Sequence, residues 1–312
     1  MQGVSINQSD VGQRVVLRRR IGVTDGRQQY TDVLGELLSL ADGVAIVRRK
    51  DGTEVAVPVD DVLTGKRVPP ARSRRVGDLE LERIAALGWP GTETAELDGW
   101  LLRAGGGFTG RANSALPVGS DPDPAAVLDW YAARGLPAMV QLPLPASAAL
   151  LAGLEGSGWR LMHGAVVLTA TTADVLARTP VRPELPEVDV ADRPDAEWLS
   201  LYHHRGNPLP AAAVDVLTAG DPTFVTLRID GRVAATCRAA TAAGWLGVTA
   251  VEVTESLRRQ GLATHLLRQV AQRSDATHVY VQTEHSNSAA LALYGRAGFT
   301  RHHEYRYLRA PD

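Results

Sequence analysis

Residues 258–263, with the sequence RRQGLA, combine the residue types that hold a phosphate group. They follow a β-patterned stretch, 244–253, and precede a stretch with apolar residues at helical spacing, 262–272. A loop that ends a strand and opens a helix presents unpaired backbone N–H groups at the positive end of the helix dipole. The small residues Gly261 and Ala263 let phosphates approach that backbone closely. This hexad therefore predicts a pyrophosphate-binding loop.

A second group of polar residues lies downstream, in the stretch 287–299 after another strand-like run. Ser286 or Asn287 can cap a helix start here, and Gly298 suits a left-handed helix stop. Asn287 and Tyr294 are seven residues apart, so at about 100° per residue they lie nearly on one helix face. The two side chains are therefore expected to point to the same side of this helix.

The order R-x-x-G-x-A followed by N-x6-Y-x3-G-F resembles the GNAT superfamily of N-acetyltransferases, strongly for residues 245–308 and more thinly elsewhere. The resemblance implies acetyl-coenzyme A as cofactor and direct acetyl transfer to a primary amine, of a small molecule or of a protein lysine. It also implies that Val251 and Val253 pair with the pantetheine amides, that Asn287 holds the same arm and that Arg296 meets a phosphate. The expected cofactor contacts are Val251, Val253, Arg258, Arg259, Gln260, Gly261, Leu262, Ala263, Thr264, Asn287, Tyr294 and Arg296.

Tyr294 has the chemistry of a general acid. In direct transfer an amine attacks the thioester and a thiolate leaves. A tyrosine with a reference pKa near 10 stays protonated at pH 7 and can donate to a thiolate of pKa near 8.5. The strand around Val251 can also donate a backbone N–H to the thioester oxygen. The alternative for Tyr294 is a half-buried helix tyrosine with no catalytic role. The alternative for the strand around Val251 is an ordinary strand of the sheet.

Five residues are candidates for the general base. Deprotonating a lysine-like amine of pKa about 10.4 at pH 7 costs roughly 4–5 kcal/mol, so a base or a desolvated site should help. We name Glu252 as a catalytic candidate together with Tyr294. The regular alternation of a strand, however, would point its side chain to the face opposite that of Val251 and Val253. The candidate bases are Glu252, Glu284, His203, His204 and His285.

The composition bounds the other classes of function. The chain has 312 residues, 45% of them hydrophobic, which is enough for two or three cores. Cys237 is the only cysteine, so we expect no disulfide, no metal site and no acyl-enzyme, because nothing placed near it would activate the thiol. No apolar run reaches about 18 residues and no signal peptide is evident, so we expect a cytoplasmic protein with no membrane partner.

The N-terminal part is expected to be a small SH3-like β-barrel over residues 1–73. Short β-patterned runs fill 11–68, with a hairpin signal at Lys50-Asp51-Gly52, and a linker rich in proline and arginine follows at 68–75. Residues 1–77 carry 13 Arg+Lys against 9 Asp+Glu, whereas the rest of the chain has a net charge of −6. We interpret this as a solvated basic face that serves protein contacts or a homodimer, and we do not expect nucleic acid.

An internal repeat predicts two related halves in the rest of the chain. Each copy reads strand, helix, Gly-aromatic pair, strand, at an offset of 141 residues that is off by one for the last pair. At this offset Ala146 and Gly153 take the places of Asn287 and Tyr294, so the first copy lacks the cofactor residues. The matched segments are Val140-Gln141 with Val281-Gln282, Ser147 to Leu150 with Ser288 to Leu291, and Gly158-Trp159 with Gly298-Phe299.

These observations predict an α/β (α+β) chain with a tandem GNAT fold, whose mixed β-sheets are centrally splayed. Residues 78–178 would form a degenerate half and 184–312 the catalytic domain, with Arg111 to Ser114 in an acceptor cleft between them. The rival hypothesis is a non-catalytic acyl-CoA sensor whose barrel binds protein or nucleic acid. The retained Tyr294 favours the enzyme.

Overall fold

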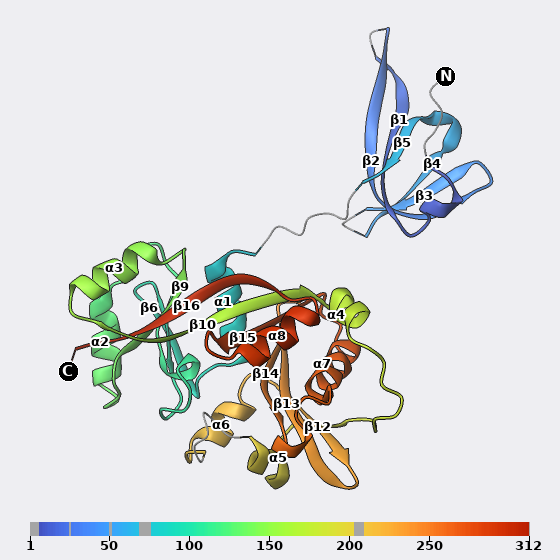
Figure 1. The fold of residues 1–312 in the computed structure, drawn as a ribbon. Coiled ribbons are helices and arrows are strands. Elements are labelled where there is room, and N and C mark those ends of the chain that lie inside the picture. The colour runs from blue at the N-terminus through green and yellow to red at the C-terminus, as the bar shows by residue number, and fades with distance from the viewer. Residues whose placement is uncertain (1–5, 25, 50–51, 69–75, 203–208, 312) are drawn as a thin grey trace. The chain divides into compact units, whose positions relative to one another are not determined.

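The chain forms two compact units, Met1–Arg75 and Val76–Asp312, in a computed structural model (Figure 1). Several expectations fall outside the described residues: most of the linker, two residues of the barrel's hairpin turn (Lys50 and Asp51), and the candidate bases His203 and His204. The structure describes residues 6–24, 26–49, 52–68, 76–202 and 209–311.

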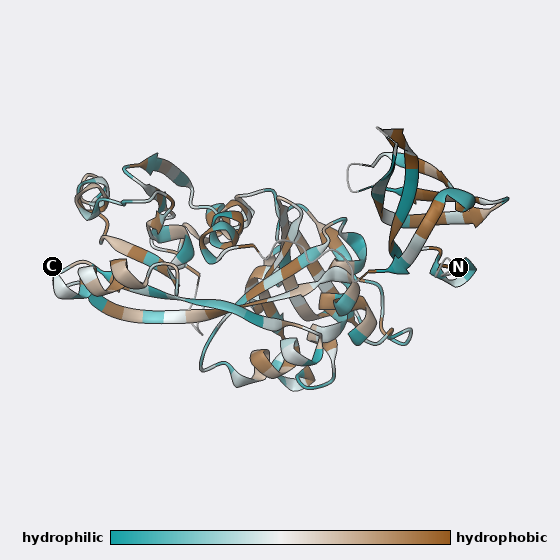
Figure 2. Ribbon diagram, turned by 90° about the horizontal axis from the view of Figure 1, so that it is seen from above, coloured by the Kyte–Doolittle hydropathy of each residue, from teal (hydrophilic) through white to brown (hydrophobic). Residues whose placement is uncertain are grey.

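The first unit is a five-stranded antiparallel sheet in the order β4-β3-β2-β1-β5. Alternate residues of its strands, such as Val33 and Leu37, are fully buried, and the apolar and polar residues alternate visibly along the strands in Figure 2. This confirms the small barrel-like β domain. Its elements are η1 (Gln8–Asp10), β1 (Arg14–Thr24), β2 (Arg27–Ala41), β3 (Val44–Arg48), β4 (Glu54–Pro58), η2 (Val59–Asp61) and β5 (Val62–Arg67).

Strands β1 and β2 are longer than their apolar patterns predict. Arg19 pairs with Thr31 and Arg20 with Tyr30, beyond the last core residues of either strand. Most of the side chains described there are exposed, so backbone pairing extends the strands without an apolar face to mark them in the sequence.

Deleting residues 1–73 should leave a folded protein, because the second unit contains its own hydrophobic clusters. We expect the shortened chain to unfold cooperatively on heating and to bind coenzyme A with unchanged affinity, as measured by calorimetry beside the full chain. Aggregation or loss of coenzyme A binding would show that the barrel is required for the second unit.

The second unit opens with α1 (Asp78–Gly88) and a three-stranded sheet, β6-β7-β8, followed by an eight-stranded mixed sheet that runs to the C-terminus. No helix in the described ranges is long and apolar enough to cross a bilayer. The remaining elements are β6 (Glu93–Leu97), β7 (Trp100–Ala104), η3 (Arg111–Asn113), β8 (Leu116–Pro117), α2 (Pro124–Ala132), β9 (Met139–Leu144), α3 (Ala148–Gly156), β10 (Arg160–Thr171), α4 (Thr172–Arg178), β11 (Asp189–Ala191), α5 (Ala196–Leu201), α6 (Ala213–Thr218), β12 (Thr223–Ile229), β13 (Arg232–Ala242), β14 (Trp245–Val253), η4 (Glu255–Leu257), α7 (Leu262–Arg273), β15 (His278–Glu284), α8 (Ser288–Arg296) and β16 (Thr300–Arg309).

The large sheet is splayed at its centre. Strands β14 and β15 are parallel but pair only over three positions, from Trp245 with His278 to Gly247 with Tyr280. Beyond this point the two strands pair with other neighbours, so a space opens between their carboxyl ends. The first copy has a shorter version of the same junction, a single parallel bridge between Ala115 and Val140.

The two copies exchange their last strands. The sheet order is β11-β12-β13-β14-β15-β10-β16-β9, so β10 of the first copy lies between β15 and β16 of the second. Strand β16 in turn pairs with β9 of the first copy. One hydrophobic cluster accordingly joins Val166 and Val175 of the first copy to Leu266 and Val281 of the second. The two copies therefore form a single structural body.

Candidate active site

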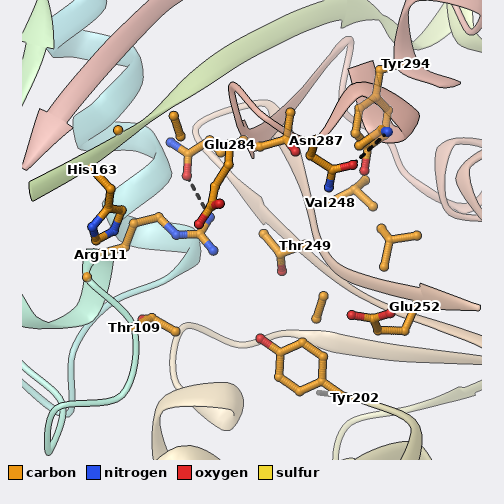
Figure 3. A pocket seen from close by; sticks show the side chains of 18 of the residues that line it. Thr109, Arg111, His163, Tyr202, Val248, Thr249, Glu252, Glu284, Asn287 and Tyr294 are labelled. Carbon is orange, nitrogen blue, oxygen red and sulfur yellow. Dashed lines mark hydrogen bonds between the residues drawn. The ribbon is translucent and has the colours of Figure 1, made fainter. Parts of the chain in front are cut away.

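A cleft of about 700 Å³ lies where β14 and β15 diverge. Its walls come from β14, β15, α8, the first half of β10, the second half of β16, the end of α5 and the turn at η3 (Figure 3). Figure 3 shows Tyr294, Asn287 and Glu252 on one side of the cleft and Arg111 and His163 on the other. The cleft thus has two chemically different ends.

A β-bulge shapes the wall that β14 forms. Between the pairs Thr236–Glu252 and Arg238–Thr249, two residues of β14 face the single residue Cys237. Ala250, one of the two, has a left-handed φ of 51°. A bulge takes backbone groups out of the ladder and re-aims the side chains that follow.

The bulge corrects the expectation from strict alternation. Val251, Glu252 and Val253 all line the cleft, although consecutive residues of a regular strand would face opposite ways. Glu252 is therefore on the same cleft as the strand backbone proposed to hold pantetheine. The sequence carries no glycine or proline at this position that would have marked the bulge.

The hexad forms the loop that opens α7. Gly261 is the N-cap residue with φ 84°, a left-handed conformation that suits glycine. The first turn of the helix presents backbone N–H groups, from Leu262 onward, that have no acceptor within the helix. Arg258 lines the cleft, and its Nε donates to the carbonyl of Val253 at 3.2 Å. The loop is thus joined to the end of the bulged strand.

Arg182 braces this loop from outside the hexad. Its Nη1 donates to the carbonyl of Gln260 at 3.1 Å, and a Cβ built on Gly261 would lie 2.7 Å from the same nitrogen. The carbonyl of a trans peptide points away from the N–H of the next residue. Arg182 therefore holds the loop on the side opposite to the N–H of Gly261, and the sequence analysis had not identified it.

Helix α8 contributes Asn287 and Tyr294 to the cleft. Asn287, not Ser286, is the N-cap: its Oδ1 accepts from the backbone N–H of Ala290 at 3.0 Å. Tyr294 is 8% exposed. Burial raises the pKa of Tyr294 above its ordinary value, and Cys237 and Glu252 raise it further. Its phenol therefore stays protonated over the working range of most enzymes.

The structure separates the candidate bases. Glu252 is half-buried and Glu284 is exposed, and both line the cleft. His285 is exposed and is not among the residues that line the cleft, and its Nε2 lies 2.9 Å from Oε2 of Glu304. Burial, the largest effect, raises the pKa of Tyr202 to about 12, and the charge of Glu252 adds to it. The charge of Glu252 therefore affects the pKa of Tyr202, and both side chains line the cleft.

Cys237 is fully buried in β13, and burial raises the pKa of its thiol to about 12. A thiol that resists ionisation is a poor nucleophile. The cleft contains no alternative cysteine, because Cys237 is the only one in the chain. This agrees with direct transfer.

Other predicted cofactor residues lie near the cleft without lining it. Arg296 is exposed in the last turn of α8, so its phosphate contact stays a prediction. The cleft also gains aromatic residues that the sequence patterns did not single out, namely Tyr202, Tyr305 and Tyr307. The predicted contacts that stay outside the lining are the hexad members Arg259, Gln260, Gly261, Leu262 and Ala263, together with Thr264, which follows the hexad.

A splayed mixed sheet, a bulged strand that lines the cleft and a left-handed glycine at the start of helix α7 are features of the fold of the GCN5-related N-acetyltransferases. A solved GCN5-related N-acetyltransferase from Kribbella flavida has a similar fold, with a TM-score of 0.53 and 20% sequence identity. The comparison covers 75% of this chain and 96% of that chain.

The chain belongs to the family described as "Probable histone acetyltransferase Rv0428c C-terminal", which matches residues 79–308. Residues 9–66 match the Rv0428c N-terminal Sm-like domain, so the small barrel is of the Sm-like kind. The chain is 31% identical over 313 residues to the Probable histone acetyltransferase Rv0428c of Mycobacterium tuberculosis, covering 96% of this chain and 95% of that protein.

A second relative is the Uncharacterized N-acetyltransferase YobR of Bacillus subtilis, which is 25% identical over 245 residues. The match covers 73% of this chain and 96% of that protein. These relatives confirm that the chain belongs to the GNAT superfamily and that it is an N-acetyltransferase.

Proposed function

We propose that the protein transfers an acetyl group directly from acetyl-coenzyme A to a primary amine. The observation that carries this proposal is the meeting of three features in one cleft: the bulge of β14, the loop that begins at Arg258, and the buried hydroxyl of Tyr294. Each is suited to a different part of an acyl-coenzyme A.

The residues present fit that cofactor. The N–H groups at the start of α7 and the guanidinium of Arg258 suit its pyrophosphate. The backbone of Val251 and Val253 at the bulge suits the pantetheine amides, and Asn287 stands at the start of α8 with its amide nitrogen left to donate. Acetyl-coenzyme A supplies an acetyl thioester when bound.

The chain's own groups would then move two protons. Glu252, half-buried on the cleft wall, is our choice to accept a proton from the acceptor amine, directly or through water. The phenol of Tyr294 donates a proton to the departing sulfur. Backbone N–H groups at the bulge stabilise the charge that develops on the carbonyl oxygen.

We further propose that residues 184–312 carry the cofactor and 78–178 form a half that lost it. In the first copy, Gly153 stands where the second has Tyr294, and 117–122 offers no loop like the hexad. The copies are thus alike in element order but differ in the side chains that chemistry needs.

Turnover tests the proposal against the sensor hypothesis. The purified full chain is mixed with acetyl-coenzyme A and a panel of primary amines, and both free coenzyme A thiol and acetylated amine are measured. We expect both products to form together. Coenzyme A release without acetylated amine would indicate hydrolysis, and tight binding without any product would favour the sensor.

A further inference from the structure

Arg111 stands at the end of the cleft opposite Tyr294 and Glu252 (Figure 3). Its backbone lies in a turn that the side chain of Asn113 holds with four hydrogen bonds. The Oδ1 of Asn113 accepts from two glycine N–H groups, and its Nδ2 donates to two carbonyls. The partners are Gly105, Gly107, Phe108 and Thr109, all at 2.8–2.9 Å. The guanidinium is therefore presented from a rigid support.

A chain of buried groups fixes the direction of the Arg111 side chain. Its Nη1 donates to Oε1 of Gln282 at 2.7 Å, and Nε2 of Gln282 donates to Oε1 of Glu82 at 2.9 Å. Glu82 is 1% exposed. The carbon of the guanidinium also lies 4.8 Å from the ring centre of Trp89. Gln282 takes up one of five N–H donors, so the others can meet a ligand.

The electrostatics at this end favour an anion. Two more arginines are buried near this end of the cleft. The buried carboxylate of Glu82 accepts hydrogen bonds from the side-chain amides of Gln141 and Gln282. Arg103 is buried and donates to Ser114 and Gln141, and Arg238 is buried and donates to backbone carbonyls. A half-buried cation gains most from a ligand that brings a negative charge.

Four tyrosines lie near Arg111, and three carboxylates line the cleft. Burial alone would lower the pKa of Arg111, but the phenols of four nearby tyrosines raise it overall, so the side chain stays charged. Glu252 stands at the opposite end, whereas the exposed Glu284 lies on the same side of the view as Arg111 (Figure 3). Glu255 is the third carboxylate that lines the cleft. The tyrosines are Tyr202, Tyr280, Tyr305 and Tyr307.

We propose that the acceptor is a small molecule that carries a carboxylate as well as its primary amine, and that Arg111 binds this carboxylate. This rests on the proposed acetyl transfer. The amine then lies toward Glu252 and the carboxylate toward Arg111, at opposite ends of the cleft. A lysine within a basic peptide would instead bring like charge toward Arg111, which is unfavourable.

Paired probes test this proposal. Each pair is an ω-amino acid and its primary carboxamide: 4-aminobutyrate, 6-aminohexanoate and 4-(aminomethyl)benzoate, whose lengths sample the spacing between the two ends. Binding to the full chain saturated with coenzyme A is measured by calorimetry, and kcat/KM is measured with acetyl-coenzyme A. We expect the acid of at least one pair to be preferred by about 10-fold or more in both measurements.

Two variants assign the preference to Arg111. Arg111→Gln should reduce the acid preference to about one, and Arg111→Lys should keep part of it, since the charge remains without the guanidinium fork. Glu255→Gln is the matched control: it removes a charge from the same cleft and should keep the preference. Circular dichroism and thermal unfolding show whether each variant folds, and coenzyme A affinity shows whether the cofactor side is intact.

The outcomes separate this proposal from the proposed function. Equal binding of acid and amide, no binding of either in any pair, or a preference that survives Arg111→Gln in the folded protein would overturn the acceptor assignment. Acid-selective binding with no transfer to any amine would support Arg111 as the carboxylate site and contradict acetyl transfer alone.

Discussion

Replacing Tyr294 by phenylalanine should lower kcat by about 10²-fold or more and leave the affinity for acetyl-coenzyme A nearly unchanged. The substitution removes one hydroxyl and keeps the ring, whose centre lies 5.5 Å from that of Phe299. Packing is therefore retained while the proton donor is lost. Steady-state kinetics with a saturating amine, together with calorimetry of coenzyme A binding, separates the two effects.

The pH profile adds a check on the same residue. Because burial raises the pKa of Tyr294, the donor stays protonated above the ordinary tyrosine range, and wild-type kcat should not fall on the alkaline side through this group. An unchanged kcat in Tyr294→Phe would mean that water or another donor protonates the thiolate, and Tyr294 would lose its role as general acid.

Replacing Gly261 by valine should weaken coenzyme A binding by at least about 10²-fold, since the phosphate contacts of the loop are lost. A β-branched side chain is strained at φ 84°, and its Cβ would meet Arg182, which braces the loop. Relieving the backbone strain or the contact with Arg182 moves the backbone N–H groups at the start of α7. Calorimetry with coenzyme A and with a coenzyme A fragment that lacks the phosphates locates the loss.

Gly231→Val is a matched control, because Gly231 also has a left-handed φ, 75°, in the hairpin between β12 and β13. No heavy atom lies within 4 Å of its added Cβ. It therefore reproduces the backbone strain away from the cleft. If Gly231→Val and Gly261→Val weakened binding equally, general destabilisation would explain the result, and the hexad would lose its assigned role.

The local parts of this molecule could be predicted from its sequence. Gly298 at the end of a helix pattern indicates a left-handed stop, and the structure has a φ of 97° there. The hairpin at Asp230-Gly231 likewise joins β12 and β13. In each case a few adjacent residues set the conformation, so distant contacts are not needed to foresee it.

The rest depends on residues that are far apart in the chain. The bulge that turns Glu252 into the cleft arises from pairing with β13, and periodicity along β14 alone predicts the opposite direction. Arg111 reaches Gln282 across 171 positions. Its position near an acceptor cleft was expected, but its buried partners were not, because no local pattern couples an η3 turn to β15.

The strand exchange has a consequence for how the first copy is retained. With β10 lying between β15 and β16, removing the first copy would open the sheet that carries the cleft and leave unpaired edges on both strands. The backbone of β10 therefore cannot be lost without breaking the sheet of the second copy. The first copy thus supports the sheet beside the cleft as well as lining the cleft, and neither copy can be moved into another protein as an independent module.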